Sequence, residues 1–200
     1  MSFPIHSICV FCGSADGLDQ AYYDAANLMG RKIAQKGVRL VYGAGRTGLM
    51  GALAKGALAE GGEVIGVAPK GLESPQLIHT SGLTRLEIVD HIQLRKARMI
   101  ELAEAFIALP GGFGTLDEIF EVLTWSQIGL QCKPAGFLNV NGYFDPLFEW
   151  FDRAFKDHFI YEEHLRLYVS DSDPAALLEK LTQFEFPDNI GRWLIRDDPQ

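Results

Sequence analysis

The sequence predicts an α/β protein with a doubly wound, mostly parallel sheet of about seven strands and helices on both faces. Three observations indicate this class. Short apolar segments alternate with longer segments whose apolar residues recur at helical spacing. Glycine or proline closes several of the apolar segments, and glycine-containing loops precede several of the helical ones. No internal repeat or interdomain linker interrupts the alternation.

The short apolar segments are expected to be buried strands. They cover residues 5–11, 38–42, 63–67, 85–89, 105–109, 135–140 and 167–169. The first is bounded by Cys12-Gly13-Ser14, the second ends in glycines, and the third is closed by Ala68-Pro69. Strands that alternate with helices pair in parallel, so the helices are expected to cover both faces of the sheet.

The longer segments are expected to be helices because of their 3.6-residue periodicity. They cover residues 21–35, 48–60, 91–103, 116–131, 143–157 and 174–182. The alternation predicts one Rossmann-like domain over residues 1–183, with residues 184–200 as a C-terminal tail. The chain has 200 residues, 48% of them hydrophobic, with 13 Phe and 3 Trp, which is enough to bury a sizeable core.

The formal net charge of −8 argues against a broad nucleic-acid-binding or membrane-binding surface, because such surfaces are basic. A small anionic substrate remains compatible with this charge. The three cysteines show no disulfide framework, and Cys9-x-x-Cys12 has no second pair that would complete a zinc site. We expect free thiols, with Cys9 and Cys12 packed in the core. No signal peptide or membrane span is evident, so a soluble cytoplasmic protein is expected.

Four loops with glycine or polar residues directly follow predicted strands and are expected at one edge of the sheet. They are Gly13-Ser14, residues 43–48, Asp90-His91 and residues 110–115. Each follows a predicted strand, and ligands of open α/β sheets bind outside the carboxyl ends of the strands. The four loops therefore predict a single binding site.

The most informative segment is Pro110-Gly111-Gly112-Phe113-Gly114-Thr115, which lies between a predicted strand and a predicted helix. Glycines let the backbone approach a ligand closely, and the free N–H groups at a helix start attract negative charge. Glu118 lies one turn inside that helix. A phosphate site next to a carboxylate suggests chemistry on a phosphorylated small molecule.

Glu118 also has a purely structural interpretation. Thr115-x-x-Glu118 fits a capping box, in which Thr115 caps the helix and Glu118 bonds back to the amide of Thr115. A carboxylate held by the cap would still be well oriented toward the expected phosphate site at residues 110–115. The capping role and the catalytic role are therefore compatible. Glu121, one turn further on, could share that face or be a solvated charge.

The loop Gly43-Ala44-Gly45-Arg46-Thr47-Gly48 fits the G-x-G-x-x-G pattern of dinucleotide sites. It follows the second predicted strand rather than the first, and the next strand ends without an acidic residue for a ribose hydroxyl. A site for a mononucleotide phosphate or sugar is therefore favoured over NAD. A tight turn that binds no ligand is the remaining alternative.

A basic cluster, Arg95-Lys96 with Arg98, lies on a predicted helix of this acidic chain. It is either a solvated helix face or a source of positive charge for the site. His91 could be a ligand or a base, although a cap or a surface position is the commoner role. Met99 and Trp125 are expected to be core or interface residues first.

Taken together, these residues resemble the LOG family of cytokinin riboside 5′-monophosphate phosphoribohydrolases, whose members are often labelled possible lysine decarboxylases. The matching segments are 10–14, 42–51, 95–99 and 110–118. The resemblance covers most of the chain. Its most specific part is the Pro-Gly-Gly-x-Gly-Thr-x-x-Glu motif with the Arg-Lys pair ahead of it.

The resemblance implies hydrolysis of the N-glycosidic bond of a nucleoside 5′-monophosphate to a free base and ribose 5-phosphate, without a cofactor or a metal. It implies Arg95 and Glu118 as the catalytic pair, with Glu121 and Met99 as supporting residues. The substrate and phosphate would be bound by Gly13, Ser14, Gly43, Gly45, Lys96, Gly111, Gly112, Gly114 and Thr115. The family also implies a homodimer with the active site near the interface.

The chain departs from the family pattern at two places. Ala44 and Arg46 stand in the second glycine loop, and Ile92 and Gln93 precede the Arg-Lys pair where the family commonly has Met and His. These departures concern recognition of the base more than bond cleavage. The alternatives are a non-catalytic nucleotide-binding module, a pyridoxal-phosphate decarboxylase and an NAD-dependent oxidoreductase.

Overall fold

The computed structural model describes residues 5–188 and 190 and contains a seven-stranded sheet in the order β4-β3-β2-β1-β5-β6-β7. All of the strand pairs within it are parallel. The strands are β1 (Ser7–Phe11), β2 (Arg39–Tyr42), β3 (Val64–Pro69), β4 (Arg85–Val89), β5 (Ala105–Ala108), β6 (Ala135–Leu138) and β7 (Tyr168–Asp171). The predicted α/β class and the parallel sheet are confirmed.

The helices lie between the strands in the predicted order. They are α1 (Gln20–Gln35), α2 (Gly48–Ala59), α3 (Ile92–Leu102), α4 (Phe113–Gln127), α5 (Asp145–Lys156) and α6 (Pro174–Thr182). Two short 3₁₀ segments, η1 (Val140–Gly142) and η2 (Glu162–Arg166), flank α5. The predicted bounds agree to within a few residues, and the largest difference that bears on function is the start of α4, three residues before the predicted one.

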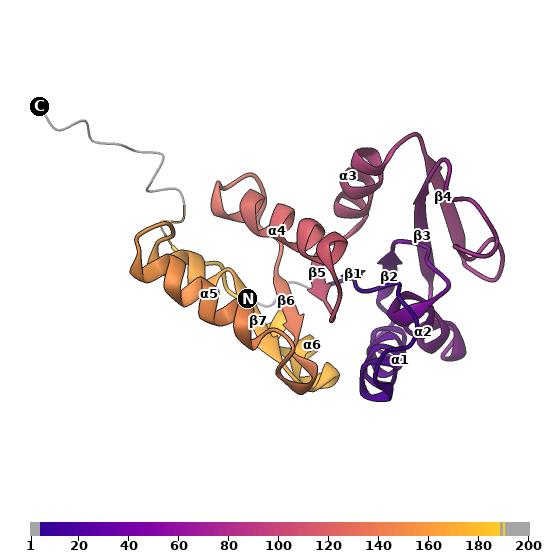
Figure 1. Ribbon diagram of the computed structural model, residues 1–200, viewed down its shortest axis with the longest axis horizontal. Helices are drawn as coiled ribbons and strands as arrows, with labels where there is room; N and C mark the ends of the chain where they lie inside the picture. Colours follow the sequence, from indigo (N-terminus) through magenta and orange to yellow (C-terminus); the bar gives the residue numbers. More distant parts are fainter. Residues whose placement is uncertain (1–4, 189, 191–200) are drawn as a thin grey trace, which may run out of the picture.

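Two hydrophobic cores form, one on each face of the sheet. One combines Ile8, Val10 and Leu40 of the strands with apolar residues of α1, α2 and α6. The other combines the alternate strand residues, such as Cys9 and Val41, with apolar residues of α3, α4 and α5. Figure 1 shows α3 and α4 on one side of the strands and α1 and α2 on the other. Helices therefore cover both faces, as predicted.

The chain order places a crevice between β1 and β5. From β1 the chain proceeds outward through β2, β3 and β4, and it then returns to β5, which pairs with the other side of β1. The connections that follow β1 and β5 consequently leave toward opposite faces. Such a switch point is where open α/β sheets bind their ligands.

The buried thiols of Cys9 and Cys12 are free and belong to the two cores, which confirms their expected packing role. The predicted tail lies largely outside the described residues. Of its described part, Phe186 and Ile190 pack against the core of α3, α4 and α5. The division into residues 1–183 and a tail stays a prediction. Over the described residues, no helix combines the length and apolarity needed to cross a membrane.

Candidate active site

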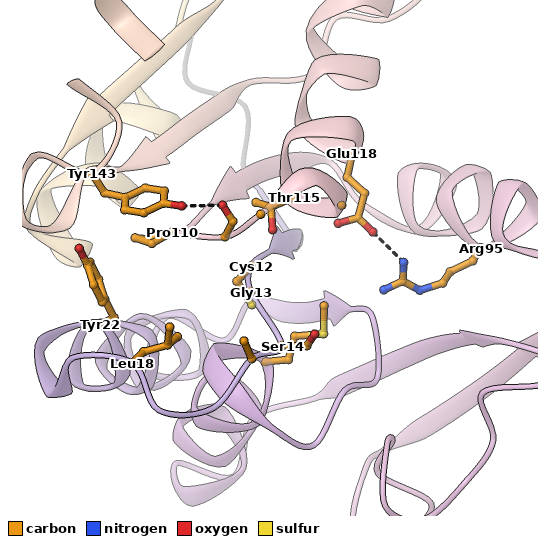
Figure 2. Close-up of a pocket in the computed structure, with 15 residues that line it drawn as sticks. Cys12, Gly13, Ser14, Leu18, Tyr22, Arg95, Pro110, Thr115, Glu118 and Tyr143 are labelled. Carbon is orange, nitrogen blue, oxygen red and sulfur yellow. Dashed lines mark hydrogen bonds and ion pairs between the residues drawn. The ribbon is translucent and has the colours of Figure 1, made fainter. Parts of the chain in front are cut away.

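A cavity of about 410 Å³ opens at the switch point between β1 and β5. The residues that line it are Cys12, Gly13, Ser14, Ala15, Leu18, Tyr22, Met50, Arg95, Pro110, Gly111, Gly112, Gly114, Thr115, Glu118 and Tyr143. In Figure 2, Glu118 and Arg95 face each other at one end, Tyr22 and Tyr143 lie at the other, and Thr115 lies between them. Two of the four predicted loops, after β1 and after β5, thus meet in one cavity.

The start of α4 has the features of an anion cradle, a set of free main-chain amides at a helix N-terminus. Gly112 is the N-cap residue and has no side chain to bond the first amides of the helix. Within the described residues, no acceptor is recorded for the main-chain amides of Phe113, Gly114 and Thr115. Gly111, Gly112, Gly114 and Thr115 all line the cavity. Free amides and the helix dipole at this position favour a bound anion.

The predicted capping box at Thr115 and Glu118 is wrong. Because α4 begins at Phe113 with Gly112 as its N-cap, Thr115 and Glu118 both lie inside the helix. The Glu118 carboxylate bonds instead to Arg95, a residue that comes from another helix. Gly112 and Gly114 are weak helix formers, so the sequence pattern indicates a later helix start than the structure has.

Arg95 and Glu118 form a buried ion pair. Arg95 Nη1 lies 2.7 Å from Glu118 Oε1, and the two residues are only 8% and 5% exposed. Arg95 Nε also donates to the carbonyl oxygen of Val67, near the end of β3, at 3.0 Å. Two fixed partners therefore hold the guanidinium in one orientation. The bond to Arg95 uses Oε1 of the Glu118 carboxylate.

Burial raises the pKa of Glu118 above the ordinary carboxyl range, although the neighbouring Arg95 opposes this rise. Burial likewise raises the pKa of the thiols of Cys9 and Cys12, and the negative charge of Glu118 adds to that rise. Both cysteines are therefore neutral around the site at physiological pH. Of the described residues that line the cavity, Arg95 and Glu118 are the only acidic or basic ones.

The second glycine loop packs closely against Arg95 and Met50. A Cβ atom at Gly43 would collide with the guanidinium of Arg95, and one at Gly45 would crowd Met50. The amides that open α2 are already used, since Gly48 N bonds to Asp16 and Leu49 N bonds to the carbonyl of Gly13. Neither Gly43 nor Gly45 lines the cavity. The loop therefore makes room for the Arg95 guanidinium, and a binding role for Gly43 and Gly45 stays a prediction.

The three basic residues of α3 have different partners. Arg95 pairs with Glu118, as described above. Lys96 Nζ lies 2.9 Å from both Asp117 Oδ2 and Glu121 Oε2, and Lys96 does not line the cavity. Arg98 pairs with Glu87 and Glu101 on the surface.

Other predicted residues also lie away from the cavity. Glu121 is bound to Lys96, and Met99 is fully buried in the core beneath α3. The ring of His91 caps α3 by accepting from Leu94 N, which is the structural alternative expected for it. Asp90 pairs with Lys70 at the surface.

Sequence reasoning missed the aromatic end of the cavity. Tyr22 of α1 and Tyr143, next to η1, form an edge-to-face pair with centroids 5.9 Å apart. The position of Tyr143 after a strand of the same sheet edge was the available signal. It was obscured because Tyr143 also fitted the start of the helix expected at residues 143–157.

These features define a Rossmann-like α/β protein whose cavity joins an anion cradle to a buried Arg–Glu pair. The chain resembles solved structures of the same fold. It superposes on a molybdenum cofactor binding protein from Rippkaea orientalis with a TM-score of 0.68 and 20% identity, covering 91% of this chain and 98% of the other. For the molybdenum cofactor carrier protein of Chlamydomonas reinhardtii the TM-score is 0.65 at 21% identity, with 89% and 96% covered. These likenesses show the fold.

Sequence comparison gives the family. The family model described as possible lysine decarboxylase matches residues 50–181. Cytokinin riboside 5′-monophosphate phosphoribohydrolase LOG of Oryza sativa subsp. japonica is 41% identical over 191 residues, which cover 96% of this chain and 78% of the relative. The LOG2 enzyme of Arabidopsis thaliana is 40% identical over 177 residues, which cover 88% and 83%. The chain belongs to the LOG family and is an enzyme of the phosphoribohydrolase class.

Proposed function

We propose that this enzyme hydrolyses the N-glycosidic bond of a nucleoside 5′-monophosphate, either AMP or an N6-substituted cytokinin riboside monophosphate, to the free base and ribose 5-phosphate. The observation that carries the proposal is the shared cavity of the α4 amides and the Arg95–Glu118 pair. The names of the relatives in rice and Arabidopsis support the same reaction.

The anion cradle at the start of α4 would bind the 5′-phosphate of the substrate. The amides of Phe113, Gly114 and Thr115 have no recorded acceptor in the described part of the chain, and a phosphate offers several acceptor oxygens. The phosphate group does not react, so its binding energy can serve to orient the ribose. The same amides bind the ribose 5-phosphate product.

Glu118 would assist cleavage of the glycosidic C1′–N bond. As the C1′–N bond lengthens, its electron pair leaves with the base and positive charge grows on the ribose. A carboxylate fixed by Arg95 stabilises that charge, and we assign to Glu118 Oε2 the role of holding a ribose hydroxyl or the attacking water. The water adds to C1′ and loses a proton, and the departing base takes up a proton. Arg95 positions the nucleotide and stabilises the leaving base.

The label of the family model points to a different reaction. Pyridoxal-dependent decarboxylation needs a lysine that forms a Schiff base with the cofactor. Among the described residues that line the cavity there is no lysine, and Lys96 is held outside it by two carboxylates. These side chains support hydrolysis of a glycosidic bond better than decarboxylation.

We also propose a homodimer with the active site near the interface. Phe113, inside the cradle segment, is 95% exposed, and Ile92 and Leu94 at the start of α3 are exposed as well. Figure 1 shows α3 and α4 side by side on one face of the sheet. Large exposed apolar side chains next to a site favour contact with a second copy. Light scattering should give twice the chain mass, and F113E should give the monomer; a wild-type monomer would contradict the dimer.

The reaction is tested by incubating the purified protein, dialysed against EDTA, with AMP and with isopentenyladenosine monophosphate. Chromatography should show release of the base from at least one of them, with an equal amount of ribose 5-phosphate. The ratio of the two rates gives the base preference. Binding of both nucleotides without release of base would contradict hydrolysis and would favour the non-catalytic binding module.

A further inference from the structure

Tyr143 touches the anion cradle from outside the family motif. Its hydroxyl donates to the main-chain carbonyl of Gly111, with Oη and O 2.7 Å apart. Gly111 follows β5, whereas Tyr143 follows β6 and lies 32 residues further along the chain. Figure 2 shows this bond at the end of the cavity away from Glu118.

Tyr143 is 42% exposed, and the buried side of its phenol ring is held by neighbouring rings. The next residue, Phe144, is 2% exposed in the core, and its amide donates to the side chain of Asn139 at 2.7 Å. Asn139 also bonds to Asp145 at the start of α5. The ring itself makes edge-to-face contacts with Tyr22 and Phe144, with centroids 5.9 and 5.1 Å away. These two contacts orient the hydroxyl toward Gly111.

The carbonyl of Gly111 is the group on which the shape of the cradle depends. If α4 began one residue earlier, this carbonyl would accept the amide of Thr115, four residues ahead. In the structure it accepts the Tyr143 hydroxyl, and no acceptor is recorded for Thr115 N within the described residues. Packing around Gly111 is tight, because a Cβ atom there would collide with Thr115 Oγ1. A small rotation of this peptide would consequently move the cradle.

We propose that the Tyr143 hydroxyl is a positioning group for phosphate binding, one that holds the Gly111 peptide so that the amides at the start of α4 stay directed into the cavity. The inference rests on the proposed function, because it takes the cradle to be the phosphate site. It adds to the motif a residue from the β6–α5 connection.

The test compares Y143F with the wild type in two measurements, steady-state kinetics on AMP or isopentenyladenosine monophosphate and calorimetric binding of ribose 5-phosphate. Loss of one neutral hydrogen bond should raise KM and the Kd of ribose 5-phosphate together by roughly three- to tenfold, with kcat within about twofold. The control is Y23F, which removes a hydroxyl from the same chain outside this cavity. It should match the wild type in both measurements.

The outcomes separate this inference from the proposed function. If the wild type binds ribose 5-phosphate and turns over substrate, and Y143F equals it in KM and Kd, the positioning role of Tyr143 is refuted while the reaction stands. A fall in kcat with unchanged KM and Kd refutes it too. If the wild type neither binds ribose 5-phosphate nor releases base, both proposals are overturned.

Discussion

Arg95 on α3 and Glu118 on α4 form a buried ion pair, with Nη1 and Oε1 2.7 Å apart. Removing one partner leaves the other as an uncompensated buried charge. R95M should therefore destabilise the fold by about 3 kcal/mol at pH 8. The loss should shrink as pH falls, because protonation of Glu118 removes the buried charge.

The sign follows from the raised pKa of Glu118. A carboxyl whose pKa in the folded state lies above its unfolded value favours folding at low pH, and this contribution is lost as pH rises through the folded pKa. Without Arg95 that pKa rises further, which enlarges the pH dependence. Urea unfolding of R95M and wild type at pH 8 and pH 5 checks this. An equal loss at both pH values would contradict the assignment.

The acid limb of the pH profile of kcat/KM should reflect Glu118. The carboxylate must be ionised to stabilise a cationic sugar, and burial raises its pKa, so activity should fall at a higher pH than for an exposed carboxyl. The charge of Asp117 contributes to the rise and that of Lys96 opposes it. D117N should move the limb down in pH and K96M should move it up, each by roughly a few tenths of a unit. Titration of the substrate phosphate is common to all three proteins, and opposite or absent shifts would count against Glu118.

Lys96 should stabilise the packing of α3 against α4 and should not bind the phosphate. Its ammonium group bridges Asp117 and Glu121 of α4 and does not line the cavity. K96M should leave the Kd of ribose 5-phosphate within about threefold of the wild type. It should lower kcat moderately, because the two salt bridges that join α3 to α4 are lost. A loss of affinity of tenfold or more, with normal kcat, would instead make Lys96 a phosphate ligand.

Ala44 holds a backbone conformation that favours glycine. Its φ is +60°, and its side chain is fully buried. A44G should relieve about 1–2 kcal/mol of strain and lose about 0.8 kcal/mol from the buried methyl, so it should raise the free energy of unfolding by up to about 1 kcal/mol and the Tm by a few degrees at most. Gly48 in the same loop has φ +57° and backbone atoms of Ser14 and Ala15 beside it, so G48A should have the opposite sign. Thermal unfolding of both variants decides, and a lower Tm for A44G would refute the strain.

The fold could be predicted from local patterns, because buried strands and amphipathic helices are encoded segment by segment. The cradle at residues 110–115 was also local, since its glycines and the helix after it adjoin in sequence. The partners of Glu118 and Gly43 could not be predicted that way. Both contact the guanidinium of Arg95, which comes from a separate helix, so a local sequence pattern does not reveal either contact. Tyr143 was missed because it fitted the start of a predicted helix, while its bond to Gly111 joins the ends of two different strands.

The central claim is that the Glu118 carboxylate stabilises a cationic ribose. E118Q keeps the size of the side chain and an oxygen that can accept from Arg95, but it removes the counter-charge of the buried guanidinium, so the fold should survive with a loss of up to about 3 kcal/mol. Turnover of AMP or isopentenyladenosine monophosphate should fall about a hundredfold or more. The Kd of ribose 5-phosphate should stay within about threefold, since the amides of α4 are untouched. Near-normal kcat in a folded E118Q protein would contradict the account.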